Sequence, residues 1–199
     1  MHANQPQPSD QLIDEPAPTI DPRHFRRTMG RFATGVTVIT VARPEGAHGM
    51  TANAFLSVSL DPPLVLVSVD RRARMHAYLA EATRYGVSVL ARDQERAARH
   101  FAGKPQAGYE PVFAWREGVP LLEGAVAQVV CDVWERVPAG DHTLVLGRVR
   151  WLDYWEREPL VFFGGDFCTV QRGSLAGRSD VWRDTPLDRA LLAGLLSSW

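Results

Sequence analysis

Three clusters of small polar residues stand out in the sequence. Their short hydroxyl or amide side chains are flanked by glycine or alanine, so a ligand could approach the backbone closely. Backbone N–H groups exposed in this way bind a planar heterocycle or a phosphate without a full positive charge. The clusters are Thr34, Gly35, Val36 and Thr37; Thr51, Ala52, Asn53 and Ala54 with Ser57 and Ser59; and Ser88, Val89 and Leu90 with Gln94.

Each cluster also has an ordinary structural explanation, because threonine is common in strands and serine and asparagine close turns. Asn53 is the hardest to explain in this way. Asparagine is depleted in strands, yet Asn53 lies between Met50 and Phe55 in a stretch otherwise suited to burial. The residues alone leave two interpretations open, ordinary strand and turn chemistry or a groove that binds a ligand.

A fourth candidate is His142, which follows the turn-forming pair Gly140-Asp141 at the start of an alternating strand. A histidine beside a turn is often no more than an exposed polar residue. The alternative is that His142 contacts a ligand at the end of the strand. The strand pattern by itself does not decide between the two.

Several other chemistries lack the residues they need. The sequence contains no GxSxG, and neither Cys131 nor Cys168 has a local histidine partner for nucleophilic catalysis. His76, His100 and His142 are dispersed and form no HxxxH or HExxH pattern, so no metal site is expected. The two cysteines match no zinc or redox spacing and are interpreted as buried thiols in a reducing compartment.

The elements expected around these residues are mostly strands joined by short turns. No GxGxxG or GxxxxGK[ST] motif follows a strand, and helices do not alternate regularly with strands. This pattern favours an antiparallel β-barrel with peripheral helices over a parallel sheet. The expected helices are 21–33, 73–82 and 93–101, the expected strands are 34–42, 49–60, 64–69, 85–90, 124–137, 142–154, 160–163 and 167–170, with turns or loops at 43–48 and 102–120.

Composition places the chain among globular proteins. It has 199 residues, 45% of them hydrophobic, and a formal net charge of −1, which gives no general attraction to nucleic acid or anionic membranes. No apolar run approaches the roughly 20 residues needed to span a bilayer. We expect a disordered leader over 1–20 without a signal peptide, a single domain over 21–170, and a tail over 171–199 with a short apolar helix. A cytoplasmic location is the default expectation.

Taken in order along the chain, these motifs resemble the flavin reductase family, the small components of two-component flavin-dependent monooxygenases. The resemblance covers about residues 22–170. It rests on FRRTMGRFATGVTVIT (25–40), GMTANAFLSVSLDPPLVLVSVD (49–70), YGVSVLARDQ (85–94), GDH (140–142) and PLVFFGGDF (159–167). The third motif begins with Ser88, where the family more often has asparagine, and this weakens a phosphate assignment there.

The resemblance implies a mainly β fold, a Greek-key split β-barrel of the flavin-binding type, and a homodimer with flavin near the subunit interface. It also implies NAD(P)H:flavin oxidoreductase activity, with FAD and NADH slightly favoured over FMN and NADPH. Thr34 to Thr37 would lie along the flavin, Thr51 to Ala54 at its ring edge, and Ser57 close by. Ser88 to Leu90 and Gln94 would face the phosphate end, helped by an arginine of the 70–74 run. Asp141 and His142 would bind the nicotinamide, with His142 the expected catalytic residue.

Three functions are compatible with this resemblance. The first is a reductase that supplies reduced flavin to a partner monooxygenase. The second is an electron-transfer protein that holds its flavin tightly and turns over little NAD(P)H. The third is a flavin-dependent enzyme of the same fold that acts on its own substrate. Sustained NAD(P)H oxidation with catalytic free flavin would support the first.

Overall fold

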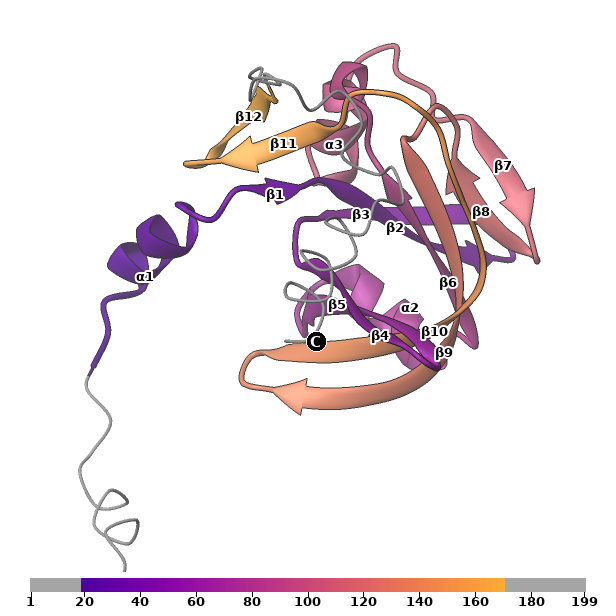
Figure 1. Ribbon diagram of the computed structural model, residues 1–199, viewed down its shortest axis with the longest axis horizontal. Helices are drawn as coiled ribbons and strands as arrows, with labels where there is room; N and C mark the ends of the chain where they lie inside the picture. The colour runs from indigo at the N-terminus through magenta and orange to yellow at the C-terminus, as the bar shows by residue number, and fades with distance from the viewer. Residues whose placement is uncertain (1–18, 171–199) are drawn as a thin grey trace, which may run out of the picture.

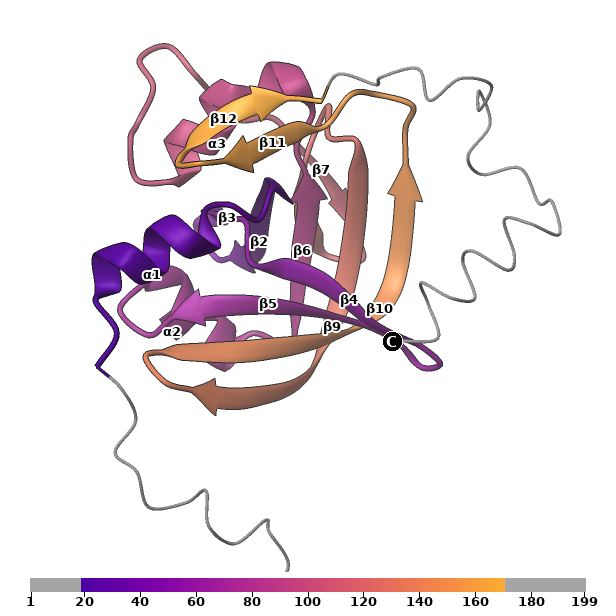
Figure 2. The same ribbon diagram turned by 60° about the vertical axis from the view of Figure 1, so that its left-hand side comes forward.

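The structure is a computed structural model that describes residues 19–170 of the chain, a β-barrel with two small accessory sheets (Figures 1 and 2). The strands are β1 (Thr34–Gly35), β2 (Thr37–Arg43), β3 (Gly46–Ala52), β4 (Phe55–Leu60), β5 (Pro63–Asp70), β6 (Arg84–Val89), β7 (Phe113–Arg116), β8 (Val119–Leu122), β9 (Ala127–Ala139), β10 (His142–Tyr154), β11 (Leu160–Phe163) and β12 (Asp166–Thr169). The helices are α1 (Pro22–Met29), α2 (Arg74–Glu81) and α3 (Glu95–Phe101), with a 3₁₀ turn at Arg92–Gln94.

Seven strands form the main sheet in the order β3-β2-β6-β9-β10-β5-β4, and every pairing is antiparallel. Its two edge strands follow one another in sequence and meet where the chain bends at Asn53-Ala54. There the backbone N–H of Ser68 donates to the Ala54 carbonyl at 3.1 Å. The sheet therefore curls towards closure, and the expected β-barrel is confirmed as a split barrel.

Both faces of the sheet are buried over β2, β6 and β9. The barrel interior holds a cluster that includes Ile39, Val67 and Tyr85, and α2 closes it with Met75 and Leu79. A second cluster on the outer face packs α3 against β2, and a third packs β8 against β9. Burial on both faces explains why the first five residues of β2 are all buried instead of alternating between buried and exposed.

Helix α1 lies outside these clusters. The Asp21 carboxylate caps it by accepting the backbone N–H groups of Arg23 and His24 at 3.2 and 3.0 Å. None of its residues is buried, and its apolar side chains Phe25 and Met29 are about half exposed. The helix projects from the barrel on the side where the β9–β10 turn, the end of β5 and the β11–β12 turn also lie (Figures 1 and 2).

The loop expected over 102–120 contains a hairpin, so this expectation was wrong. Strands β7 and β8 pair around a turn at Glu117-Gly118, where both residues have positive φ, 51° and 77°. β8 is fully buried and covers the outer face of β6, where the Ser88 side chain accepts the backbone N–H of Leu122 at 3.0 Å. The hairpin was missed because its strands have four residues each and Pro120 lies within one.

The boundaries at 21–60 also differ from expectation. The helix ends at Met29, not near residue 33, and the strand expected over 34–42 breaks at Val36, whose carbonyl accepts the Leu90 N–H. The turn expected over 43–48 shrinks to two residues, because β2 and β3 continue into it. The extended segment 49–60 is two strands, and Asn53 lies in the bend between them, which explains an asparagine in that stretch.

Cys131 should remain unreactive in the folded protein, while Cys168 reacts. Burial raises the pKa of the Cys131 thiol to about 12, whereas Cys168 on β12 is only partly buried. A chromogenic thiol reagent at pH 8 should therefore label one cysteine quickly and the second only at the rate of unfolding. Simultaneous fast labelling of both cysteines, with Cys168→Ser as the single-thiol control, would contradict this placement.

None of the helices in the described part of the chain has the length and apolarity needed for a bilayer crossing. Within residues 19–170, no group of three or more His, Cys, Asp and Glu side chains is arranged to hold a metal ion. The leader expected over 1–20 falls mostly outside the described residues, and the apolar helix expected within 171–199 falls entirely outside them.

Candidate functional site

The three small-polar clusters meet at one end of adjacent strands. Thr37 on β2 stands opposite Ala52 on β3 and, on its other side, opposite Val89 on β6. One residue further along β2, Val38 stands between Thr51 and Ser88. Residues that are more than fifty positions apart in sequence therefore lie side by side, as a ligand groove would require.

The first cluster continues beneath a separate hairpin. Thr34 and Gly35 pair with Phe162 and Val161 of β11, so this hairpin lies against the approach to β2. Gly35 is exposed, and a Cβ added to it would meet nothing within 4 Å. The Thr34 hydroxyl is buried and has no hydrogen-bond partner among residues 19–170. A buried hydroxyl without a partner is costly in a folded protein, which makes Thr34 a candidate for bonding a ligand.

Three other hydroxyls in the clusters are used within the protein. Thr37 Oγ1 donates to the Ala52 carbonyl and Thr51 Oγ1 to the Ala98 carbonyl, each at 2.7 Å, while Ser88 is fully buried against β8. These side chains hold β2, β3, α3 and β8 together. A ligand in contact with these positions would be left mainly with their backbone groups, so the Ser88 side chain is not free to face a phosphate.

The bend between β3 and β4 is open to solvent. Asn53 and Ala54 are exposed, and so is Ser57 on β4, which stands opposite Val65 on β5. Ser59 is partly buried beside the bulge that separates it from Ser57. Asn53 and Ala54 are thus the accessible members of the second cluster.

Gln94 lies in a different contact network, next to the strand end at Leu90. Its Oε1 accepts the Ala91 N–H at 2.9 Å and its Nε2 donates to the Glu123 carbonyl at 2.7 Å. Both polar ends of the side chain are therefore engaged. Gln94 ties the turn after β6 to the segment before β9.

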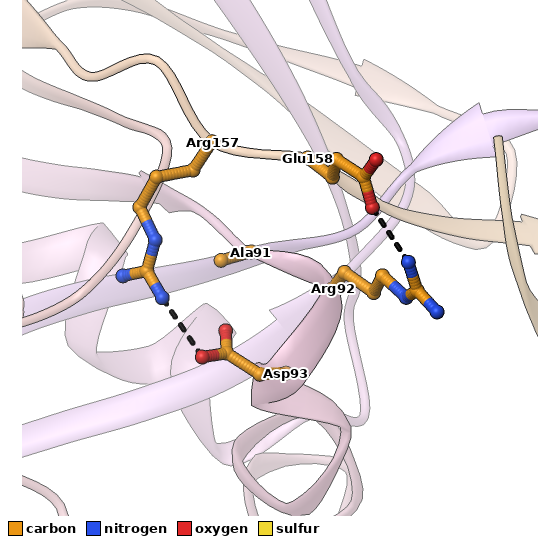
Figure 3. A pocket seen from close by; sticks show the side chains of 5 residues that line it. All are labelled: Ala91, Arg92, Asp93, Arg157 and Glu158. Carbon is orange, nitrogen blue, oxygen red and sulfur yellow. Dashed lines mark hydrogen bonds and ion pairs between the residues drawn. The ribbon is translucent and has the colours of Figure 1, made fainter. Parts of the chain in front are cut away.

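An open pocket of about 460 Å³ adjoins this turn (Figure 3). Two ion pairs cross it, Arg157 with Asp93 at 2.8 Å and Arg92 with Glu158 at 2.7 Å. Both arginines are thus already neutralised by carboxylates. The pairs fasten the crossover from β10 to β11 onto the 3₁₀ turn beneath it, as the dashed lines in Figure 3 show.

His142 begins β10 and stands opposite Asp70, the last residue of β5. Its Nδ1 lies 2.7 Å from the Asp141 carboxylate, and the His142 side chain remains 40% exposed. The hydrogen bond from His142 keeps the pKa of Asp141 below its ordinary value, so this carboxylate is ionised at neutral pH. An ionised carboxylate at Nδ1 favours the tautomer with the proton on that nitrogen and leaves Nε2 free.

The strand register places His142 at the same end of the barrel as the Asn53-Ala54 bend. Ala54 bonds to Ser68, which stands opposite Leu144, two residues along from His142. With strands about 4.8 Å apart and a rise of about 3.3 Å per residue, the backbones of Ala54 and His142 are roughly 12 Å apart. We call Gly35, Thr37, Ala52, Ala54 and His142 together the strand-end row.

The arginine run at 70–74 lies by His142 and not by Gln94. The Arg71 N–H donates to the Asp141 carbonyl at 3.1 Å, and Arg72 forms an ion pair with Asp70 at 2.7 Å. Hydrogen bonds from Arg72 hold the pKa of Asp70 well below its ordinary range. The structure therefore does not place this run beside Gln94, as expected. The arginine near Gln94 is instead Arg157, since both side chains approach Gly124.

Sequence reasoning missed several neighbours of the strand-end row. Phe162 was quoted only as part of a motif, although it stands opposite Thr34. Asp70 ends a buried strand with a charge, a signal that could have singled it out. His76, Nε2 of which lies 2.9 Å from Thr143 Oγ1, gave no signal in the sequence, because only the fold brings α2 to β10.

A family model described as a flavin reductase like domain matches residues 29–171. A relative from a Rhodococcus species, an NADH-dependent flavin reductase, is 52% identical over 171 residues, 83% of this chain and 94% of that protein. The reductase component of 4-hydroxyphenylacetate 3-monooxygenase from Thermus thermophilus is 41% identical over 140 residues, 70% of this chain and 90% of that protein.

Solved structures agree with these matches. The structure of a flavin reductase in its native state superposes with a TM-score of 0.75 at 43% identity, covering 77% of this chain and all of that one. Other relatives are named as an NADH-dependent FAD reductase and as an NADH-dependent FMN reductase. Four of these proteins are named as reductases of flavin, FAD or FMN, and one as the reductase component of a monooxygenase.

Proposed function

This chain belongs to the flavin reductase-like family and is an NAD(P)H-dependent flavin reductase, and we propose that its strand-end row aligns the dinucleotide with the flavin. Relatives use NADH with FAD or FMN, and several are reductase components of two-component monooxygenases. The observation that carries the site assignment is the convergence of Thr37, Ala52 and Val89 on one end of the sheet.

The residues present fit a flavin. The Thr34 hydroxyl is buried with no partner in the described chain, and a carbonyl or ring nitrogen of an isoalloxazine could accept its proton. Gly35, Asn53 and Ala54 expose backbone along the same edge, where a planar ring could approach. No full positive charge is required for the ring itself, in keeping with the side chains in the strand-end row.

When bound, the flavin supplies the two-electron chemistry by accepting hydride from the nicotinamide. The protein contributes position, because hydride transfer requires the reacting atoms about 3–3.5 Å apart. His142 has Nε2 free to hydrogen-bond the carboxamide or ribose of the dinucleotide. The Asp141 carboxylate fixes the orientation of the His142 imidazole and keeps the proton on its Nδ1. Asn53, Thr34 and the backbone around Gly35 would hold the edge of the flavin ring.

Exchange of the flavin follows from the openness of this end of the barrel. Asn53, Ala54 and the Asp141 turn are exposed in the described chain. A reduced flavin held by backbone contacts and one hydroxyl could leave for a partner monooxygenase after reduction. We place the enzyme in the cytoplasm, where a free half-buried thiol such as Cys168 stays reduced.

A homodimer would cover the apolar face of α1. An isolated helix of eight residues is not stable in water, and Phe25, Met29 and Phe32 are more than half exposed. A second copy packed on this face would bury them close to the strand-end row. Sedimentation velocity of the full chain should give a dimer, and a Phe25→Glu/Met29→Glu variant should shift it to monomer.

Steady-state oxidation of NADH tests the reductase function directly. Purified enzyme with excess NADH and catalytic FAD or FMN should consume many equivalents of NADH per flavin in air. A single stoichiometric bleach of tightly bound flavin would instead identify an electron-transfer protein. Parallel titrations with FAD, FMN, NADH and NADPH rank the preferences, and we expect FAD and NADH to be favoured.

Replacing Thr34 with valine should weaken flavin binding without destabilising the fold. The hydroxyl has no protein partner in the described chain, so its loss leaves no group unsatisfied, whereas the flavin loses about 1 kcal/mol, or roughly fivefold in Kd. Fluorescence quenching on flavin titration measures the affinity. Thr169→Val, at an exposed position on β12, is the matched control. An unchanged flavin Kd in Thr34→Val would remove Thr34 from the site.

A further inference from the structure

The tip of the β9–β10 hairpin is held from one side by a single segment, residues 70–76. Three consecutive residues of the hairpin contact it. The Asp141 carbonyl accepts the Arg71 N–H, His142 stands opposite Asp70, and Thr143 Oγ1 shares a hydrogen bond with His76 Nε2 at 2.9 Å. On the other side, His142 has only the exposed Ala139 of its own hairpin as a pair.

The His76–Thr143 hydrogen bond differs from the other two contacts because it reaches the inner face of β10. Thr143 and Val145 are buried and alternate with His142 and Leu144, so the Thr143 side chain points towards the barrel interior and the His142 side chain away from it. His76 thus holds β10 from beneath at the residue next to His142. The tip of a hairpin otherwise opens easily, because few buried contacts hold it.

Helix α2 does not need His76 for its own anchoring. Met75 and Leu79 are 1% exposed and already fix the helix in the barrel core. The His76 ring is only partly buried, and its polar contact is directed at Thr143. Helix α2 is therefore fixed in the core, and the hydrogen bond from His76 ties β10, the strand that carries His142, to this fixed helix.

We propose that His76 is a positioning residue for NADH, acting through Thr143 to fix the backbone at His142. This inference rests on the proposed role of His142 in orienting the dinucleotide. Loss of the hydrogen bond would let the hairpin tip shift without touching the flavin contacts at Thr34 and Asn53. The expected consequence is weaker NADH binding with an unchanged flavin affinity.

Kinetics of matched variants test the proposal. Thr143→Val removes the hydroxyl at nearly constant volume, and His76→Leu removes the imidazole. Each should raise the KM for NADH about fivefold, the equivalent of one neutral hydrogen bond, with kcat within twofold and flavin Kd unchanged. Thr143→Ser keeps the hydroxyl and should restore the wild-type KM. The double variant His76→Leu/Thr143→Val should be no worse than either single variant.

A structural role alone would give a different pattern. In that case the variants would lower the melting temperature measured by circular dichroism but leave the KM for NADH unchanged in the folded enzyme. NMR of the His142 imidazole adds an independent readout, since its ¹⁵N shifts should change in Thr143→Val and not in Thr143→Ser. Unchanged shifts together with an unchanged KM would overturn the proposal, whether or not the variants lose stability.

His142→Ala, measured in the same assay, separates the proposed role of His142 in binding NADH from the proposed positioning role of His76. A raised KM in His142→Ala with a wild-type KM in Thr143→Val and His76→Leu refutes the positioning role alone. A wild-type KM in His142→Ala refutes the proposed role of His142 and the inference that rests on it. Flavin reduction by the wild-type enzyme remains the test of the reductase activity itself.

Discussion

Replacing His142 with alanine should raise the KM for NADH by up to about tenfold and change kcat less than KM. A hydrogen bond between neutral groups, such as His142 Nε2 and the carboxamide or ribose of the dinucleotide, contributes about 0.5–1.5 kcal/mol, and each 1.4 kcal/mol is a factor of about ten in binding. The proposed flavin contacts lie on other strands, so flavin affinity should not change. Initial rates over a range of NADH concentrations at saturating flavin measure the effect.

The matched control is His100→Ala. His100 lies on α3, where its ring packs edge-on against Phe101 and Tyr109. The KM of the His100→Ala variant for NADH should equal that of the wild type. Asp141→Asn, which weakens the bond to His142 Nδ1 while preserving its shape, should fall between the wild type and His142→Ala. Wild-type KM and kcat in His142→Ala would refute a role for His142 in binding the dinucleotide.

Replacing Gly147 with alanine should destabilise the barrel by about 3 kcal/mol or more, the upper part of the range for overpacked cores. A Cβ at Gly147 would overlap Tyr85 Oη and lie 2.7 Å from Cys131 Cβ. Tyr85 is fully buried and Cys131 Cβ is fixed to the backbone of β9, so neither can withdraw cheaply. Urea denaturation followed by tryptophan fluorescence measures the free energy of unfolding.

Two further variants show whether the crowding is the cause. Arg148→Ala, at the next and exposed position of β10, should change stability by less than about 0.5 kcal/mol. In the Tyr85→Leu background the Gly147→Ala substitution should cost less than it does alone, because the ring that blocks it has gone. Strict additivity of the two substitutions would show that the Tyr85 ring is not what excludes a side chain at Gly147.

Much of the barrel could be predicted because its strands carry local signals. Each of three local patterns predicts the start of an element to within a few residues. These are the β-branched run of β2, the Asp61-Pro62 break before β5 and the turn at Gly140-Asp141. The β7–β8 hairpin carried no such signal. Val119 to Leu122 is buried because Thr40 and Ser88 on neighbouring strands bond its backbone, and this depends on contacts 34 and 80 residues away in sequence.

In the candidate site, too, some features carry a local sequence signal and others depend on contacts between distant residues. Asn53 was singled out because asparagine is out of place in a strand, and the structure shows the bend that resolves this. The convergence of Thr37, Ala52 and Val89 depends on strand order, which no local pattern specifies. The buried Ser88 side chain misled the sequence argument, because a serine at a strand end looks the same whether it faces a ligand or another strand.

The hydrogen bond between the end of α1 and the β11–β12 turn would link assembly to flavin retention in the proposed homodimer. The Gly164 N–H donates to the carbonyl of Gly30, the residue that ends α1, at 2.8 Å, and the same hairpin holds Phe162 opposite Thr34. In the proposed homodimer, burying α1 would steady this hairpin over the flavin. By thermodynamic reciprocity, flavin would then tighten the subunits by the same factor. Dilution would therefore release subunits and cofactor together, and the apparent flavin affinity would depend on the enzyme concentration.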